Sequence, residues 1–394
     1  MMQQAAIPLG VGMRLLAETA GDSASLVLPR TATGDYRDLS TLEQFAAECD
    51  VVTFDHEHVP TEHLRALERS GVAVRPGADA LVHAQDKATM RERLTALGVP
   101  CPAYAVVRDG REVAAFAERA GWPVVLKTTR GGYDGRGVWV VAAVGEAESV
   151  LARTADMRAF SAGSGAAGPA ARGGLLAEAN IPFRRELAVL VARSPLGQAV
   201  AYPTVETIQR DGICHEVIAP APGLDIGLAL SAQHAALTIA HQLGVTGMLA
   251  VEMFEVDGAM LVNELAMRPH NSGHWTIEGA VTSQFEQHLR AVLDLPLGSP
   301  RMTAPYAVMV NILGGARADL YDGLVHVLAR DPGAHVHLYG KSVRPGRKVG
   351  HVTVVGDDLE DVRERARHAA AHLRGDPAED NTITTGDQRQ EQMS

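Results

Sequence analysis

The sequence predicts a multidomain protein of mixed α/β and α+β class. Its 394 residues suffice for two or three domains with hydrophobic cores, and 46% hydrophobic with 21% charged residues is ordinary for a globular chain. The N-terminal part alternates short apolar strands with helical stretches, which is typical of an α/β unit. Strands joined by tight turns follow further along, which indicates antiparallel sheet and hence the α+β part.

Composition and charge exclude several classes of protein. The net charge of -11 argues against a nucleic-acid partner bound through a general basic surface. Cys49, Cys101 and Cys214 lack CxxC spacing, so we predict neither a disulfide framework nor a zinc site. No apolar run is long enough for a membrane helix, and the first residues lack a signal-peptide pattern. We therefore expect a cytoplasmic protein without a membrane partner.

The first part of the chain, residues 1–82, is predicted to be an incomplete α/β domain. Its expected elements are a helix over residues 3–20 and strands near residues 25–28 and 51–54. The run Asp55-His56-Glu57-His58 follows the last of these strands, at the edge where parallel sheets bind ligands. Two histidines around a carboxylate can indicate a metal, but this spacing suits a loop poorly, and a solvated turn is the better interpretation.

A glycine-rich hairpin is the first stretch that indicates chemistry. The elements expected before and around it are helices over residues 84–96 and 112–120 and strands over residues 122–127 and 138–141. Between the two strands, residues 131–137 contain four glycines, flanked by Lys127 and Arg136. Backbone N–H groups of such a loop can close over phosphate oxygens, although it matches neither the P-loop nor the GxGxxG motif. Phosphate binding is therefore favoured over a merely flexible hairpin.

The middle of the chain is expected to consist mostly of strands. A low-complexity stretch over residues 161–174 is predicted to be a mobile surface insertion without chemistry. The elements expected beyond it are strands over residues 175–180, 186–192 and 199–204, a turn at residues 210–212 and an amphipathic helix over residues 229–243.

The densest polar stretch of the chain, residues 262–276, follows a hairpin. The expected hairpin consists of strands over residues 247–254 and 259–262, joined by an Asp257-Gly258 turn. A register centred on Gly258 makes Glu252 and Glu264 cross-strand neighbours, which like charges disfavour. Either one carboxylate faces solvent, or the register slips, or a hard cation such as Mg²⁺ lies between them. The glycine-rich loop, as a second phosphate-binding signal, favours the cation.

A smaller β-rich module is expected near the C-terminal end. The elements expected from residue 276 onward are a helix over residues 276–293, a linker over residues 296–305 and strands near residues 307–312 and 335–338. Residues 341–348 carry four cations, which indicates an anion site in an acidic protein, although a solvated basic turn is the usual meaning. The polar tail, residues 375–394, is predicted to be disordered.

Three stretches together resemble the ATP-grasp ligases and, within them, the 5-(carboxyamino)imidazole ribonucleotide synthases of purine biosynthesis. They are residues 130–137, 263–276 and 344–351, and the resemblance extends over residues 3–355. The first stretch indicates only the superfamily, whereas the other two are specific. The architecture that the resemblance implies is a Rossmann-like domain over residues 1–82, an ATP-grasp domain over residues 83–298 with lobes at 103–180 and 181–298, and a module over residues 299–374.

The resemblance implies an ATP-dependent carbon–nitrogen ligase. In such an enzyme bicarbonate attacks the γ-phosphate of ATP to give carboxyphosphate, and the amine of aminoimidazole ribonucleotide then takes the carboxyl group. The implied cofactor is Mg²⁺, for which Mn²⁺ can substitute, and the implied assembly is a homodimer.

The resemblance also implies a role for each site residue. The residues implied in catalysis are Arg268, which stabilises carboxyphosphate, Lys341, Tyr133 and Arg136. Those implied in ATP binding are Lys127, Gly132, Tyr133, Asp134, Gly135, Arg136, Gly137, the hinge residues Glu178, Ala179, Asn180 and Ile181, Glu186, Asn263 and Glu264. Those implied in holding the ribonucleotide are Tyr133, Arg136, Asn271, Ser272, Lys341, Arg347 and Lys348, and the implied metal ligands are Glu252 and Glu264. Strand alternation, however, aims Asn263 away from the face of Glu264.

Three features depart from ATP-grasp patterns. The strand and glycine turn that precede the first helix in the family are missing, which we interpret as a late start codon rather than a damaged domain. Many members have an ATP-contacting arginine where this chain has His83. Ala266 stands where ATP-grasp enzymes at large often have an asparagine ligand, an alanine that the specific family shares.

Two alternative functions remain at this point. One is an ATP-grasp ligase with another acceptor, such as the formate-dependent glycinamide ribonucleotide transformylase or the biotin carboxylases. The segments 270–275 and 344–348 argue against it. The other is a nucleotide-binding protein without turnover, which the missing first strand suggests.

Overall fold

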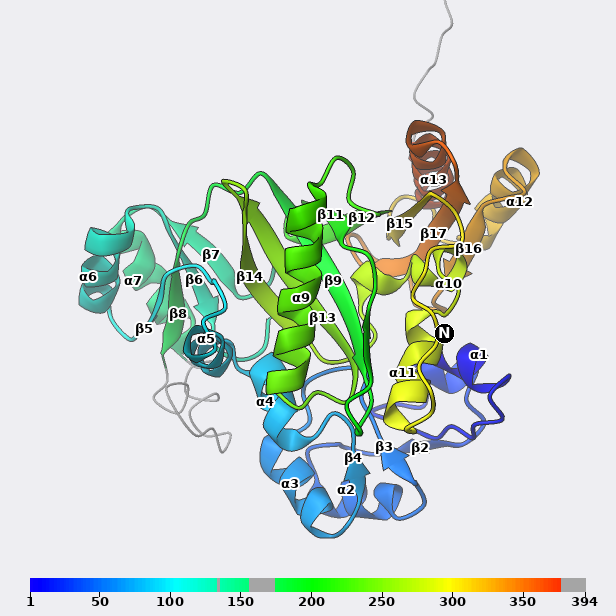
Figure 1. Cartoon of the computed structure of the whole chain (residues 1–394), viewed down its shortest axis with the longest axis horizontal. Coiled ribbons are helices and arrows are strands. Elements are labelled where there is room, and N and C mark those ends of the chain that lie inside the picture. Colours follow the sequence, from blue (N-terminus) through cyan, green and yellow to red (C-terminus); the bar gives the residue numbers. More distant parts are fainter. Residues whose placement is uncertain (133–134, 156–173, 377–394) are drawn as a thin grey trace, which may run out of the picture.

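The computed structural model describes residues 1–132, 135–155 and 174–376, and its largest sheet has nine strands (Figure 1). The strand order is β14-β13-β9-β11-β12-β15-β17-β16, with β10 paired to β9, and neighbouring strands are antiparallel. The strands are β9 (Arg185–Arg193), β10 (Ala199–Ala201), β11 (Val205–Arg210), β12 (Ile213–Ala219), β13 (Gly247–Val256), β14 (Ala259–Ala266), β15 (Tyr306–Leu313), β16 (His335–Leu338) and β17 (Lys348–Gly356). Within the described part of the chain, no helix is long and apolar enough to cross a membrane.

The N-terminal domain consists of two small parallel sheets and short helices. Its elements are α1 (Met2–Ala6), β1 (Leu15–Ala17), the 3₁₀ helix η1 (Ser23–Leu26), β2 (Thr31–Thr33), α2 (Leu39–Ala46), β3 (Val51–Val52), α3 (Thr61–Arg69), β4 (Ala73–Val74) and α4 (Ala78–Gln85). The helix predicted over residues 3–20 ends already at Ala6, because Pro8 has no N–H to continue the helical hydrogen bonds and Gly10 turns at φ +65°. The strand predicted near residues 25–28 is also wrong, because the N–H of Ser25 folds back onto the carbonyl of Asp22 at 2.9 Å.

The small lobe is a four-stranded antiparallel sheet with two helices. Its elements are β5 (Tyr104–Val107), α6 (Gly110–Ala120), β6 (Val124–Thr128), β7 (Val138–Val141), α7 (Val144–Arg153) and β8 (Leu175–Ala179), with strand order β5-β8-β6-β7. The predicted hairpin is confirmed, since β6 and β7 pair antiparallel on either side of the glycine-rich loop. The predicted insertion at residues 161–174 lies, except for Gly174, outside the described residues.

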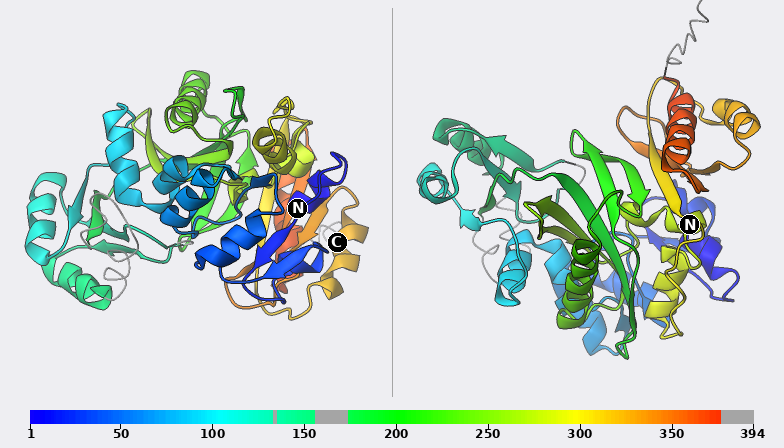
Figure 2. Two further views of the ribbon diagram at one scale, coloured as in Figure 1. Left: turned by 90° about the horizontal axis from the view of Figure 1, so that it is seen from below. Right: turned by 45° about the horizontal axis from the view of Figure 1, so that its top comes forward.

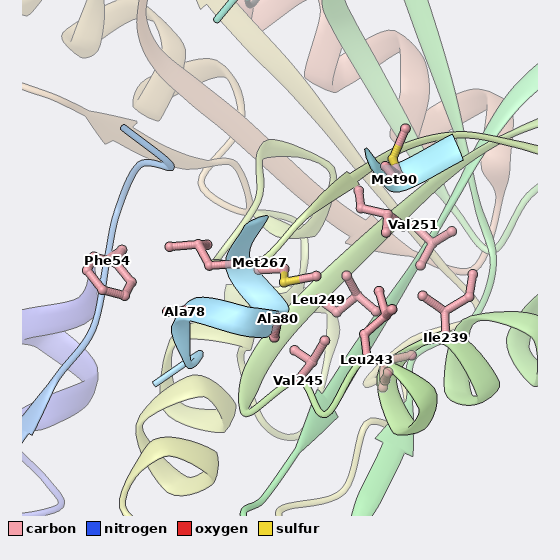
Figure 3. Close-up of a cluster of buried hydrophobic side chains, with 14 of the residues drawn as sticks. Phe54, Ala78, Ala80, Met90, Ile239, Leu243, Val245, Leu249, Val251 and Met267 are labelled. Atoms are coloured by element: carbon pink, nitrogen blue, oxygen red, sulfur yellow. The ribbon is translucent and has the colours of Figure 1, made fainter. Parts of the chain in front are cut away.

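A hydrophobic core joins the N-terminal domain to one face of the large sheet. Helix α9 (Ile226–Gln242) covers this face, and residues of α4 and α5 (Lys87–Ala96) pack into the same cluster. The residues that Figure 3 labels in this cluster are Phe54, Ala78, Ala80, Met90, Ile239, Leu243, Val245, Leu249, Val251 and Met267.

The helix predicted over residues 84–96 begins only at Lys87. Asp86 is extended there, at φ -133°, and caps α5 by accepting the N–H of Thr89 at 3.0 Å.

The strands of the C-terminal region extend the large sheet instead of forming a sheet of their own. Strand β15 pairs with β12, and β17 pairs with β15. The strands on either side of the predicted linker therefore belong to one sheet. Viewed from below, the small lobe and the C-terminal strands lie at opposite ends of the molecule (Figure 2, left). The remaining helices are η3 (Asn271–Gly273), α10 (Thr276–Gly279), α11 (Gln284–Val292), α12 (Tyr321–Arg330) and α13 (Leu359–Arg374).

Several middle and C-terminal elements also differ from prediction. The helix predicted over residues 276–293 is broken between α10 and α11, where the side chain of Ser283 caps the second helix. The strand predicted over residues 199–204 ends at Ala201, ahead of Pro203. Strands β11, β12 and β17 were not predicted, although the turn between the first two was.

Candidate active site

A cavity of about 730 Å³ lies where the N-terminal domain, both lobes and strand β17 meet. Its lining includes His56, Glu57, His58, Lys87, Lys127, Gly132, Gly135, Glu178, Ala179, Asn180, Ile181, Glu186, Gln209, Glu252, Asn263, Glu264, Arg268, His270, Asn271, Ser272 and Lys348. Polar groups that are remote in the sequence therefore converge on one cleft, as is typical of a ligand-binding site.

The two carboxylates Glu252 and Glu264 face each other in the β13–β14 hairpin. The Asp257-Gly258 turn, with φ values of 48° and 75°, starts a ladder that runs to Met253 opposite Val262. Continued unchanged, this ladder would place Asn263 opposite Glu252. A register shift makes Asn263 an extra residue on β14, so that Glu264 takes that place. The predicted pairing of the two glutamates is confirmed, and a β-bulge produces it.

The same bulge changes the direction of Asn263. Lys127 Nζ donates to Asn263 Oδ1 at 3.1 Å, and both residues line the cavity together with Glu264. The expectation that strand alternation points Asn263 away from the site is therefore wrong. Alternation holds only for a regular ladder, and the bulge interrupts it at this residue.

The environments of the acidic groups differ. Burial, followed by the charges of Glu264 and Glu186, raises the pKa of Glu252 to about 7. Burial also raises the pKa of Glu186 to about 7. Burial opposes ionisation of Glu264 as well, but its ion pair with Lys87 outweighs this and lowers the pKa of Glu264. His270 does not neutralise Glu252, because burial, Arg268 and Lys348 lower the pKa of His270 to about 3.

The donor set fits a magnesium ion that is shared with a ligand. Over residues 1–132, 135–155 and 174–376, no group of three or more His, Cys, Asp and Glu side chains is placed to hold a metal. Mg²⁺ commonly binds one or two carboxylates and completes its shell with phosphate oxygens and water. The pair of Glu252 and Glu264 meets this requirement, and a divalent cation would offset the repulsion that raises the pKa of Glu252.

We expect Mg²⁺ to stabilise the protein more at pH 8 than at pH 6. Glu252 and Glu186 have ordinary pKa values of 4.5 and folded values of about 7, so the native state binds more protons between these limits. Stability without metal should fall as pH rises through this window, and ionised Glu252 should then bind Mg²⁺ better. Thermal unfolding with MgCl₂ or KCl at equal ionic strength tests this at both pH values. An equal Mg²⁺ effect at pH 6 and pH 8 would contradict it.

Lysine side chains contribute positive charge to the cavity. Of the 36 lysines and arginines in the chain, four are lysines: Lys87, Lys127, Lys341 and Lys348. Three of the four, all but Lys341, line the cavity. A lysine ammonium is a compact point charge on a flexible stem and suits phosphate oxygens. The rarity of lysine is thus a sequence signal that identifies Lys87, which was not predicted as a site residue.

Glycines of the glycine-rich loop form part of the cavity wall. Gly132 and Gly135 line it, whereas Tyr133 and Asp134 lie outside the described residues. Gly135 has a φ of +74°, and a Cβ there would lie 3.1 Å from the carbonyl oxygen of Asp211 in the β11–β12 turn. Only glycine combines this conformation with so close an approach between the two lobes.

Several other residues that were predicted for the site do not line the cavity. Arg136, Gly137, Lys341 and Arg347 are not among the lining residues. Lys341 Nζ lies 5.4 Å from the ring centroid of Tyr339, and Arg347 Nη1 donates to Ser342 Oγ at 2.7 Å. Asn271 lines the cavity while its amide exchanges hydrogen bonds of 2.9 and 2.8 Å with that of Asn311.

The loop after β3 also contributes to the site, which the sequence did not predict. His56, Glu57 and His58 line the cavity, and Asp55 and His58 are exposed, as expected for a solvated turn. Glu57 Oε1 lies 2.9 Å from Arg268 Nε in an ion pair. At the α4–α5 junction, Ala84, Gln85 and Lys87 line the cavity, whereas His83 does not.

Family models and known proteins match this chain over most of its length. The models are a ribonucleotide synthetase preATP-grasp domain at residues 1–85, an ATP-grasp domain at residues 92–285 and a phosphoribosylaminoimidazole carboxylase C-terminal domain at residues 307–365. N5-carboxyaminoimidazole ribonucleotide synthase from Mycobacterium tuberculosis is 53% identical over 95% of this chain and 85% of that protein. The enzyme of the same name from Corynebacterium ammoniagenes is 45% identical over 95% of this chain and 89% of that protein.

Solved structures agree with these matches. N5-carboxyaminoimidazole ribonucleotide synthetase from Thermus thermophilus has a TM-score of 0.81 at 36% identity and covers 96% of both chains. The synthase from Aspergillus clavatus, solved in complex with ADP and 5-aminoimidazole ribonucleotide, has a TM-score of 0.81 at 31% identity and covers 94% of both chains. The chain described here therefore belongs to the N5-carboxyaminoimidazole ribonucleotide synthase family of ATP-grasp enzymes.

Proposed function

We propose that this protein carboxylates 5-aminoimidazole ribonucleotide with ATP and bicarbonate in purine biosynthesis. The observation that carries this function is the convergence of the glycine-rich loop, Lys127 and the facing pair of Glu252 and Glu264 on one cavity. The Aspergillus clavatus relative, which binds ADP and the ribonucleotide, supports the choice of substrates.

The nucleotide is proposed to lie between the two lobes. Apolar side chains that line the cavity, and can hold the adenine, are Val125, Val138, Val140, Phe183 and Phe254. The hinge from Glu178 to Ile181 borders this region, and Glu186 would bind the ribose. Lys127 and the loop from Gly132 to Gly137 would hold the phosphates. Glu252 and Glu264 would hold Mg²⁺, or Mn²⁺ in its place, which when bound neutralises charge on the phosphates.

The chemistry requires positioning and charge stabilisation rather than a protein nucleophile. A bicarbonate oxygen attacks the γ-phosphorus, ADP leaves, and carboxyphosphate forms. The amine of the ribonucleotide then attacks the carboxyl carbon, the C–O bond breaks, and phosphate departs with that oxygen. Arg268, oriented by Glu57, would stabilise the negative charge of carboxyphosphate. The glycine-rich loop would exclude water, which hydrolyses this intermediate.

The ribonucleotide is proposed to bind at the end of the cavity near β17. The residues proposed to hold it are Tyr133, Arg136, Asn271, Ser272, Lys341, Arg347 and Lys348. Lys341 and Arg347 lie on the exposed segment between β16 and β17, which leads directly to Lys348 in the cavity. This segment would therefore meet the ribonucleotide at the mouth of the cleft.

Lys341→Ala is expected to raise the KM for aminoimidazole ribonucleotide roughly tenfold, the scale of one charge-assisted phosphate contact. The KM for ATP should stay within about twofold, because Lys341 lies outside the nucleotide end of the cavity. Arg330→Ala, which removes an exposed cation on α12, is the matched control. A change confined to the KM for ATP would refute this role.

Steady ADP release tests the proposed function. The proposal requires that release depend on both bicarbonate and aminoimidazole ribonucleotide. Dependence on formate would identify a transformylase-like enzyme, and ATP binding without release would identify a binding protein. We further propose that the protein is a cytoplasmic homodimer, as the family resemblance implies. Sedimentation of the purified protein tests the dimeric state.

A further inference from the structure

Arg91 connects the two lobes beneath the nucleotide site without lining the cavity. It extends from α5, and its side chain is only 1% exposed. Its Nε donates to Glu178 Oε1 at 2.6 Å, and its Nη2 donates to the main-chain oxygen of Asn263 at 2.7 Å. One guanidinium therefore joins the hinge strand β8 of the small lobe to strand β14 of the large lobe.

The contact with Asn263 falls on the β-bulge. Asn263 is the extra residue of the bulge, so its backbone has no opposite partner in the β13–β14 ladder. Arg91 binds the carbonyl of this residue, and Lys127 binds its side chain at 3.1 Å. Both cations thus hold the irregularity that places Glu264 opposite Glu252.

The contact with Glu178 affects the net charge that Lys127 presents to the cavity. Glu178 is 2% exposed, and its second oxygen, Oε2, lies 2.6 Å from Lys127 Nζ. Burial opposes ionisation of Glu178, but Arg91 and then Lys127 outweigh it and lower the pKa of Glu178. Two cations share one buried carboxylate, so the group of three keeps one positive charge. That charge faces the cavity through Lys127.

We infer that Arg91 is a positioning residue that sets the affinity for both the nucleotide phosphates and Mg²⁺. It leaves the charge of Lys127 available to phosphate by sharing Glu178, and it preserves the facing carboxylates by fixing the bulge at Asn263. The inference rests on the proposed Mg²⁺–nucleotide site and extends it to a residue that touches neither ligand.

ADP binding by calorimetry, with EDTA and with MgCl₂, separates the two effects. Arg91→Met is expected to raise the Kd for ADP roughly tenfold or more in EDTA and to reduce the gain in affinity that Mg²⁺ gives, because it removes two charge-assisted hydrogen bonds. Arg91→Lys keeps the charge but lacks the fork. Its Kd in EDTA should stay within about threefold of wild type, while the Mg²⁺ gain falls as in Arg91→Met.

A double variant tests the charge argument. In Arg91→Met, Glu178 is left to Lys127 alone, so adding Glu178→Gln should recover most of the ADP affinity in EDTA but not the Mg²⁺ gain. Recovery of ADP affinity at an unchanged thermal unfolding temperature supports this effect of charge, whereas recovery that only follows a rise in that temperature contradicts it, because it indicates relief of an unpaired buried carboxylate. Arg93→Met, on the same helix, is the control and should leave both values within about twofold.

Wild-type ADP affinity and Mg²⁺ gain in Arg91→Lys and Arg91→Met would overturn the inference. If Arg91→Met does not fold, Arg91→Lys decides alone, through the Mg²⁺ gain. The ADP-binding measurement needs no ribonucleotide. A negative result there can therefore be distinguished from failure of the proposed function, which is tested by ADP release from the wild-type enzyme.

Discussion

Replacing Glu264 by glutamine is expected to reduce kcat at least about 100-fold, the scale on which loss of a preorganised charge commonly acts. The amide keeps the volume of the side chain but is a far weaker magnesium ligand than a carboxylate. The side chain is 40% exposed toward the cleft and pairs with Lys87, so the free energy of unfolding should change by no more than about 1 kcal/mol. Steady-state ADP release, with thermal unfolding in parallel, measures both quantities.

Glu43→Gln, at an exposed position on α2, is the matched control and should behave as wild type. The Glu264→Gln variant carries a second expectation. Since Glu264 helps to raise the pKa of Glu252, that pKa should fall when the charge is removed. A Glu264→Gln variant that turns over with normal Mg²⁺ dependence would refute the metal role of this residue.

Replacing Arg268 by methionine is expected to lower kcat roughly 100- to 1,000-fold with little effect on the KM for ATP. Arg268 lines the cavity beside Glu57 and is proposed to stabilise carboxyphosphate, which exists only after ATP has bound and reacted. Arg268→Lys should recover part of the rate, because it keeps the charge but loses the planar fork. Initial rates at varied ATP concentration give both constants.

The ion pair with Glu57 requires a control of its own. Removing Arg268 leaves the Glu57 side chain, which is 16% exposed, without its partner, and this alone could disturb the site. The double variant Arg268→Met/Glu57→Gln removes that charge. If its kcat returns to the wild-type value, the loss in Arg268→Met comes from the unpaired glutamate and not from catalysis. Arg301→Met, at an exposed position, should have no effect.

The central hairpin shows how far the sequence alone leads. The Asp257-Gly258 turn and the positions of Glu252 and Glu264 were enough to predict that the two carboxylates meet. The bulge at Asn263 was not predictable, because Arg91 from α5 and Lys127 from β6 bind that residue, and no local pattern reports those contacts. The predicted direction of the Asn263 side chain is wrong for the same reason.

The loop after β3 and the C-terminal strands show the same limit. Glu57 reaches Arg268 from a distant part of the chain, so its role appears only once the N-terminal domain is packed against the large sheet. Likewise β15 continues the sheet through its pairing with β12, a long-range contact that strand propensity does not encode. Local signals such as the glycine-rich hairpin predict the strand pairing correctly, because neighbouring residues determine it.

An isotope experiment tests carboxyphosphate formation most directly. With bicarbonate labelled with ¹⁸O, ATP and aminoimidazole ribonucleotide, the oxygen that attacks the γ-phosphorus stays on phosphorus when the C–O bond breaks. Mass spectrometry of the released phosphate should therefore find one ¹⁸O atom per phosphate formed, which carboxyphosphate chemistry requires. Phosphate released during ribonucleotide-dependent turnover without this label would contradict the account.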